Sequence, residues 1–185
     1  KVFYFGNTEK NQEDYLKPIN NIQTDDDEII VLAEEITRDI SNGYDKVLAI
    51  HNWIAKNICY DIAGYNNPNY SNVSALDVLK NKYTICEGYS NLAAALLRSI
   101  GIPCKVVRGF AIDDNANEIW TKENIGSTAN HAWNEVYINN RWLIMDITWD
   151  SDNKYENGQY NYGEKNNWKY FDIDIEAFSL NHRID

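Results

Sequence analysis

The spacing of apolar residues changes at Cys104, and this change limits the fold more than any other feature of the sequence. Before Cys104, apolar side chains recur with the 3.6-residue period of amphipathic helices. After it, the segments HAWNEVYI and RWLIMDITWD are short and rich in β-branched and aromatic residues, which is typical of strands. Helices that come first and strands that come later predict an α+β fold with an antiparallel sheet.

The first half of the chain is predicted to contain four helices, each with an apolar stripe and a recognisable start or stop signal. Their expected ranges are about 26–40, 44–57, 75–81 and 86–100. Thr24 or Asp25 is the expected cap of the first helix, and Gly43 is expected to end it. Ser74 is the expected cap of the short third helix.

The two strand segments near the end are predicted to form a hairpin with Asn139 and Asn140 in its turn. Asn tolerates the positive φ that a two-residue hairpin turn requires. Ile138 then faces Arg141, and this pair determines the register of every other pair in the hairpin.

In that register Asp146 lies opposite Trp133, and His131 lies opposite Thr148. Side chains alternate between the two faces of a strand, so His131 and Asp146 share a face. As diagonal neighbours their Cβ atoms are about 7 Å apart, within reach of a carboxylate–imidazole hydrogen bond. Asp150 is the other diagonal neighbour of His131, and the spacing does not choose between the two acids. Aromatic residues on the same face predict that other parts of the chain cover it.

Cys86 stands at the start of the last predicted helix. Unpaired backbone N–H groups and the positive end of the helix dipole favour a thiolate at that place. The N–H of Cys86 itself points toward the position where a tetrahedral oxyanion would form. A nearby imidazole, oriented by a carboxylate, would complete an activated nucleophile. The alternative is a buried thiol that acts only as a small apolar side chain.

Composition narrows the possible partners and compartments. The net charge of −11 argues against nucleic acid or anionic lipid as a partner. No apolar run approaches the ~20 residues that a membrane helix needs, so membrane insertion is not expected. A surface rich in Asn, Tyr and Asp favours an exported bacterial protein, and a first residue other than Met suggests a piece of a longer chain.

The remaining cysteines and histidines are predicted to be structural. Cys59 and Cys104 are expected in the core, with a disulfide between them as the alternative. The sequence has no CxxC pair and no pair of histidines at ligand spacing, so a metal site is not expected. His51 and His182 are assigned no role in function.

Three segments resemble the core of the transglutaminase-like superfamily, in its bacterial branch. They are KVLAIHNWIAKNICYD, CEGYSNLAAALLRSIGIPCKVV and NHAWNEVYINNRWLIMDITWD. The resemblance covers about residues 44–150, and KYFDI with NHRID resembles a C-terminal extension of some exported members. It implies a papain-like fold in which the nucleophile helix packs on an antiparallel sheet or half-barrel. One domain is expected over 1–185, with an irregular lead-in at 1–25, the core at about 44–150 and the extension at 151–185.

Carried onto this sequence, the resemblance implies a role for each residue of a triad. Cys86 would be the nucleophile, His131 the general base and acid, and Asp146 the residue that orients the imidazole, which selects it over Asp150. No cofactor is implied. Tyr89 and Trp133 are candidate substrate contacts in a groove, with packing as the alternative. Further candidates for the groove are Tyr60, Tyr65, Tyr70 and Tyr83, and either Tyr83 or a residue of the loop at 66–72 is considered as the second oxyanion donor.

The resulting functional hypothesis is thiol-dependent acyl transfer on glutaminyl or peptide amides through a Cys86 acyl-enzyme. Cross-linking, deamidation and peptide hydrolysis all remain open at this stage. The alternative is a catalytically silent module that binds peptide or cell wall. The expected partner is a protein or peptide outside the cell or at its surface, and the oligomeric state is left open.

Overall fold

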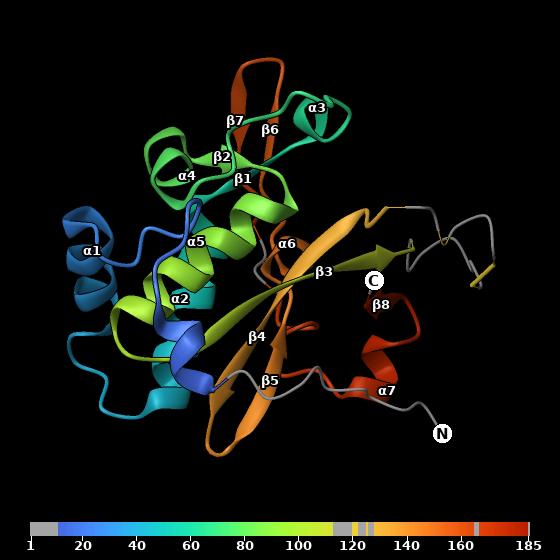
Figure 1. Cartoon of the computed structure of the whole chain (residues 1–185). Helices are drawn as coiled ribbons and strands as arrows, with labels where there is room; N and C mark the ends of the chain where they lie inside the picture. The colour runs from blue at the N-terminus through green and yellow to red at the C-terminus, as the bar shows by residue number, and fades with distance from the viewer. Residues whose placement is uncertain (1–10, 113–119, 122–124, 126–127, 165–166, 185) are drawn as a thin grey trace.

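The computed structural model describes residues 11–112, 120–121, 125, 128–164 and 167–184. Helices and strands succeed one another along the chain as expected, and the α+β fold is confirmed (Figure 1). The helices are the 3-10 helix Gln12–Leu16, α1 Asp27–Thr37, α2 Gly43–Asn57, α3 Ile62–Tyr65, α4 Ala75–Asn81, α5 Cys86–Ser99, α6 Ile147–Asp150 and α7 Ile175–Phe178. The strands are β1 Cys59–Asp61, β2 Tyr83–Thr84, β3 Cys104–Ala111, β4 His131–Ile138, β5 Arg141–Met145, β6 Lys154–Glu156, β7 Gln159–Asn161 and β8 His182–Ile184.

Helix α5 is the central element of the fold, and almost all of its side chains are buried. It packs on β3 and β4 on one side and on α1, α2 and α4 on the other (Figure 1). Its apolar residues join those of α2 and of the sheet in one large cluster, which includes Leu92, Leu96, Ile50, Ile54 and Val136. Burial on several sides fixes the helix, so the position of its first residue, Cys86, is fixed as well.

The main sheet is antiparallel and has the strand order β5-β4-β3-β8. In the hairpin of β4 and β5, Ile138 pairs with Arg141, as the turn prediction requires. Asn139 and Asn140 have φ values of 52° and 60°, in the left-handed region that Asn tolerates. The predicted register is therefore confirmed for every pair that β5 makes with β4.

The hairpin ends earlier than predicted. Strand β5 stops at Met145, and Asp146 caps the short helix α6, where its side chain accepts a hydrogen bond from the Trp149 N–H at 3.3 Å. The predicted pairings of Asp146 with Trp133 and of Thr148 with His131 are therefore wrong. The cause is local, because a carboxylate at this position stabilises a helix start in competition with the strand.

The helix boundaries near the N-terminus also differ from the prediction. Gly43 begins α2 and does not end α1, because the Asn42 side chain accepts from the Tyr44 N–H and caps α2. Helix α1 is capped by Asp26 and not by Thr24 or Asp25. Ser74 caps α4 as predicted, with the Asp77 N–H as its donor.

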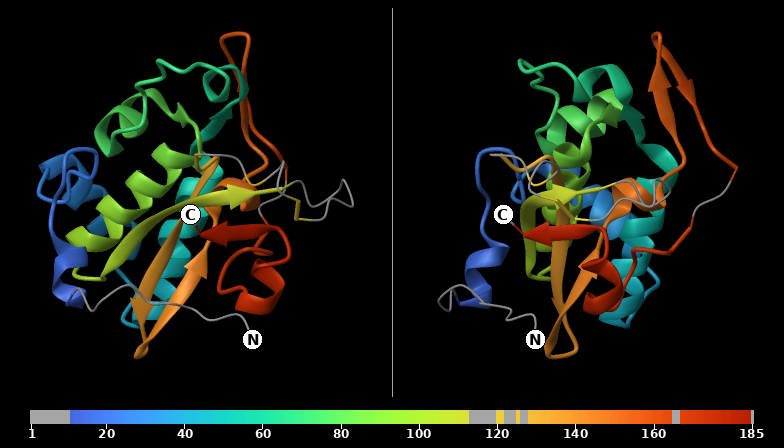
Figure 2. Two further views of the ribbon diagram at one scale, coloured as in Figure 1. Left: turned by 45° about the vertical axis from the view of Figure 1, so that its right-hand side comes forward. Right: turned by 90° about the vertical axis from the view of Figure 1, so that its right-hand side faces the viewer.

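A second, smaller sheet was not predicted. Its order is β2-β1-β6-β7, and β1 pairs in parallel with both β2 and β6. The hairpin of β6 and β7 extends away from the helices beside α3 (Figures 1 and 2). Strands of two or three residues, paired across long separations in the sequence, carry little periodic signal.

The far face of the main sheet is covered, as its aromatic residues predicted. Trp133, Ile144, Tyr170 and Phe178 form a second apolar cluster there, opposite the helices. Helix α7, which supplies Phe178, lies on this side of the sheet (Figure 2). Within the described part of the chain, no helix combines the length and the hydropathy needed to cross a membrane.

Strand β8 approaches β3 very closely at Gly109. A Cβ atom at that position would collide with the backbone carbonyl of Arg183 and with the Trp133 ring. Glycine therefore lets the last strand pair with β3 and bring His182 opposite Ala111.

Candidate active site

The structure brings together the three residues predicted to form a triad. Cys86 is the first residue of α5, His131 is the first residue of β4, and Asp146 joins β5 to α6. The imidazole Nε2 of His131 lies 2.6 Å from the Asp146 carboxylate Oδ2. Cys86 and His131 line the same pocket, and the thiol is close enough to the imidazole to raise its pKa. Because Asp146 occupies Nε2, Nδ1 is the nitrogen left to face the sulfur.

The backbone around Cys86 leaves the start of α5 open to a ligand. Ile85 occupies the N-cap position and gives the helix no side-chain cap. The Cys86 N–H has no acceptor within the helix and remains available to an anionic group, whereas the Gly88 N–H donates to the Ile85 carbonyl at 3.0 Å. Gly88, in the first turn, has no room for a Cβ because Thr84 packs against it. This contact holds the start of the helix against strand β2.

Charge is concentrated on the pair of His131 and Asp146. Burial alone would lower the pKa of His131, but the Asp146 charge, its hydrogen bond and the Cys86 thiol outweigh burial and raise that pKa to about 10. Burial would raise the pKa of Asp146, but the two imidazoles of His131 and His182 hold it well below its usual value. An imidazolium next to the sulfur is the state that stabilises a thiolate.

The other two cysteines lack this environment. Cys59, Cys86 and Cys104 are all free, so the alternative of a disulfide between Cys59 and Cys104 is wrong. Both of these thiols are buried as predicted. Burial raises the pKa of Cys59 to about 11 and that of Cys104 to about 12. They are therefore protonated at neutral pH, and we expect neither to react with an alkylating reagent.

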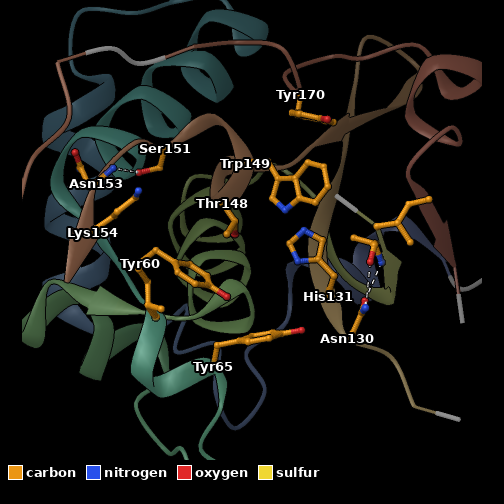
Figure 3. Close-up of a pocket in the computed structure, with 13 residues that line it drawn as sticks. Tyr60, Tyr65, Asn130, His131, Thr148, Trp149, Ser151, Asn153, Lys154 and Tyr170 are labelled. Atoms are coloured by element: carbon orange, nitrogen blue, oxygen red, sulfur yellow. Dashed lines mark hydrogen bonds between the residues drawn. The ribbon is translucent and has the colours of Figure 1, made fainter. Parts of the chain in front are cut away.

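His131 lies between two pockets. The first, of about 530 Å³, is lined by aromatic and polar side chains that include Tyr60, Tyr65 and Trp149 (Figure 3). The second is lined by Cys86 and by residues near it, among them Glu87 and Arg108. Both pockets include Tyr65, Asn130 and His131. A substrate in either pocket would therefore contact the imidazole.

The predicted substrate contacts Tyr89 and Trp133 do not line either pocket. Each side chain is 1% exposed. The Tyr89 hydroxyl donates to the Ile58 carbonyl, and the Trp133 ring packs edge-on against Phe178. Both residues belong to the apolar clusters of the core, and this position favours the alternative of packing. The apolar pattern of a strand and of a helix places aromatic residues inside more often than in a groove.

The tyrosines from the loops divide into two groups. Tyr60 and Tyr65 line the first pocket, where their phenol rings extend to the side on which His131 lies (Figure 3). Tyr83 instead stacks on Tyr155 of the second sheet, with ring centroids 3.9 Å apart, and lines neither pocket beside His131. The suggestion that Tyr83 is an oxyanion donor finds no support in this position.

Two histidines that the sequence analysis assigned no role make buried pairs with carboxylates. His182 Nε2 lies 3.1 Å from Asp146 Oδ2, and His51 Nε2 lies 3.0 Å from Asp150 Oδ2. The two residues of the first pair are 36 positions apart in the sequence, and those of the second pair are 99 positions apart. No local spacing in the sequence could have indicated either pair.

One group of side chains has the composition of a metal site. Among the described residues, the ligand atoms of His131, Asp146 and His182 lie within 4.8 Å of one another. A metal ion there would require both imidazoles to give up their hydrogen bonds to Asp146. A charge-assisted hydrogen bond from the His131 N–H to the Asp146 carboxylate explains the distance of 2.6 Å between them without a metal ion.

Comparison with known proteins agrees with this geometry. A family model described as the transglutaminase-like superfamily matches residues 30–147. Human kyphoscoliosis peptidase is 30% identical over 120 residues, which make up 65% of this chain and 18% of that protein. The uncharacterized protein YebA of Bacillus subtilis is 26% identical over 148 residues, which make up 75% of this chain and 20% of that protein.

Two solved structures resemble the fold. A presumed cysteine protease from Cytophaga hutchinsonii is 32% identical with a TM-score of 0.57, and the match covers 74% of this chain and 41% of that one. The periplasmic domain of TgpA from Pseudomonas aeruginosa, bound to ethylmercury, is 21% identical with a TM-score of 0.54, over 76% of this chain and 49% of that one. In each of these comparisons the chain spans less than half the length of its relative.

Proposed function

Because this chain belongs to the transglutaminase-like superfamily, we propose that it catalyses thiol-dependent acyl transfer on peptide or glutaminyl amides, with water as the principal acceptor. The observation that carries the proposal is the position of the His131 imidazole, which is hydrogen-bonded to Asp146 and lines one pocket together with Cys86. The names of two relatives at least 30% identical, a peptidase and a presumed cysteine protease, support hydrolysis.

The first half of the reaction forms an acyl-enzyme. The Cys86 sulfur attacks the amide carbonyl carbon, and the C=O electron pair moves onto oxygen. As the tetrahedral intermediate collapses, the C–N bond breaks and the His131 imidazolium gives its proton to the leaving amine. The products are a thioester on Cys86, a free amine or ammonia, and a neutral imidazole. Throughout, Asp146 holds the Nε2 proton of His131, so that Nδ1 is the nitrogen that gains and loses a proton.

The second half returns the enzyme to its starting state. Neutral His131 takes a proton from water or from an acceptor amine, which attacks the thioester carbonyl. The C–S bond breaks, the acyl group leaves as an acid or as a new amide, and His131 and Cys86 again hold the imidazolium and the thiolate. The first pocket has polar lining groups, among them Ser151, Asn153 and Lys154, and offers water a path to the imidazole.

Two groups are placed to stabilise the oxyanion. One is the backbone N–H of Cys86, at the uncapped start of α5. The other is the phenol of Tyr60, which lines the first pocket and is close enough to Cys86 and Asp146 to feel their charges. Burial, with a smaller effect of those charges, raises the pKa of Tyr60 well above its usual value. The hydroxyl therefore keeps its proton and remains a donor.

Replacing Tyr60 with phenylalanine tests this assignment. We expect Tyr60→Phe to lower kcat by about 100-fold or more with little change in KM, because the lost hydrogen bond forms only in the transition state. Steady-state kinetics on a peptide substrate would measure this effect. The matched control is Tyr65→Phe, which removes a phenol from the same pocket at a residue 49% exposed. An equal loss in both variants would contradict a specific role for Tyr60.

We also propose that the substrate is a protein or peptide outside the cytoplasm. The pockets on either side of His131 suit an extended chain with aromatic and polar side chains. The match to a periplasmic domain of TgpA and the acidic composition are consistent with that location.

Two assays run side by side test the proposed function. One measures incorporation of a fluorescent amine into a glutamine-donor peptide, and the other measures cleavage of a peptide library by mass spectrometry. Cleavage without incorporation is the expected result. Incorporation without cleavage would make cross-linking the main reaction and would overturn the preference for water. Inactivity in both assays, together with an unreactive Cys86, would instead favour a binding module that has the fold and no turnover.

A further inference from the structure

The Asp146 carboxylate is held by two imidazoles. His131 Nε2 and His182 Nε2 lie 2.6 Å and 3.1 Å from the same oxygen, Oδ2. All three side chains are buried. The other carboxylate oxygen caps α6 by accepting from the Trp149 N–H at 3.3 Å. Each oxygen of Asp146 therefore has a partner besides His131 that limits its rotation.

The ring of His182 is itself fixed in place. It stacks on Phe178 with centroids 4.0 Å apart and an interplanar angle of 12°, and it contacts the Trp149 ring at 4.5 Å. Pairing of β8 with β3 sets the backbone of His182, and Gly109 permits that pairing. A side chain 1% exposed between aromatic rings has few other rotamers to adopt.

The chemistry at Asp146 requires a proton on His182 Nε2, because a carboxylate can only accept. Burial lowers the pKa of His182, although Asp146 opposes that shift, so the neutral ring with one N–H is favoured at neutral pH. Its other nitrogen, Nδ1, lies 2.7 Å from Oδ1 of Asn181, whose NH₂ donates to the Tyr170 hydroxyl at 2.8 Å. A half-turn of the amide exchanges its oxygen and nitrogen, so the NH₂ can donate to Nδ1 while the oxygen accepts from the Tyr170 hydroxyl, which places the His182 proton on Nε2.

We propose that His182 is a positioning residue for the triad, and that its Nε2–H holds Asp146 in the orientation that aims His131 Nδ1 at Cys86. This inference rests on the proposed function. It adds to the triad a residue outside the span 30–147 that matches the family. The last strand of the described chain therefore completes the support of the catalytic base, and His182 acts through Asp146 without touching substrate.

The test uses two substitutions of nearly equal shape. His182→Gln keeps an N–H₂ donor near the Nε2 position, whereas His182→Met fills similar space without a donor. We expect His182→Met to lower kcat by about 10- to 100-fold with KM nearly unchanged, because a small misplacement of a catalytic group can cost about 100-fold. We expect His182→Gln to keep most of the kcat that His182→Met loses. The rate of Cys86 alkylation by iodoacetamide should follow the same order, and it needs no substrate.

His51→Met is the matched control, because His51 forms the other buried pair with a carboxylate of α6 but does not contact Asp146. It should lower thermal stability and leave the alkylation rate of Cys86 unchanged. Equal kcat and alkylation rates in wild type and a folded His182→Met would overturn the inference, as would a His182→Gln variant no better than His182→Met. If wild type itself shows neither turnover nor alkylation of Cys86, the proposed function fails instead.

A measurement on the unaltered protein covers the case in which His182→Met does not fold. Histidine-selective ¹⁵N NMR distinguishes the two tautomers of a neutral imidazole. The inference requires the His182 proton on Nε2 at neutral pH. A His182 ring with its only proton on Nδ1 would overturn it.

Discussion

Replacement of Cys86 with alanine will abolish the proposed acyl transfer, with a fall in kcat/KM of about 10⁴-fold or more. The side chain is 6% exposed, starts helix α5 and lines a pocket with the His131 imidazole, whose pKa is raised to about 10. Alanine removes the sulfur and leaves the small side chain that the helix start accommodates. The fold should therefore persist, and thermal unfolding should change little.

Alkylation supplies a direct readout for Cys86. After iodoacetamide treatment at pH 7, intact-mass and peptide analysis should find one modified cysteine in wild type and none in Cys86→Ala. Cys104→Ala provides the matched control, because burial raises the pKa of that thiol to about 12 and it contacts no imidazole. Modification of Cys104 in preference to Cys86, or full activity of Cys86→Ala, would rule out Cys86 as the nucleophile.

Replacement of Asp146 with asparagine should lower kcat by a comparable factor, about 10⁴-fold. Asparagine is a good N-cap, so its oxygen can still accept from the Trp149 N–H and keep α6 in place. Its NH₂ then takes the position of Oδ2 and faces His131 Nε2. Because NH₂ cannot accept a hydrogen bond, Nε2 must lose its proton, and the proton moves to Nδ1 beside the sulfur. In that tautomer His131 cannot act as the base toward Cys86.

The same substitution has a pH signature. In wild type, Asp146 opposes the effect of burial and raises the pKa of His131 to about 10. Without the Asp146 charge, burial lowers the pKa of His131, so the imidazolium that stabilises the thiolate is lost at lower pH. The rate of Cys86 alkylation at pH 8 should therefore fall in Asp146→Asn.

Asp150→Asn is the matched control for Asp146→Asn, since Asp150 is also a buried acid, at the other end of α6, but pairs with His51. We expect lower thermal stability from this control with little change in kcat. A pH profile of alkylation in Asp146→Asn identical to that of wild type would show that Asp146 does not set the state of His131.

Local signals explain what could be predicted from the sequence. The pair Asn139 and Asn140 determines a two-residue turn, and one turn fixes every pair between β4 and β5. Cys86 could be placed at a helix start because a strong helical period begins there and ends at GIP. Both features depend only on residues close in sequence.

The features that were missed depend on contacts between distant residues. Asp146 ends β5 by capping α6, and the choice between strand and helix at that residue depends on the Trp149 N–H and on the imidazoles around it. The second sheet and the contact of His182 with Asp146 join segments far apart in the chain. Tertiary packing determines these pairings, and the spacing of apolar residues in the sequence carries no information about it.

The two pockets that share His131, Tyr65 and Asn130 have a consequence for the kind of bond that the protein would attack. We propose that a bound polypeptide lies across both pockets, so that neither of its ends is near the sulfur. We therefore expect attack in the interior of long chains, as in an endopeptidase, and not the stepwise removal of terminal residues.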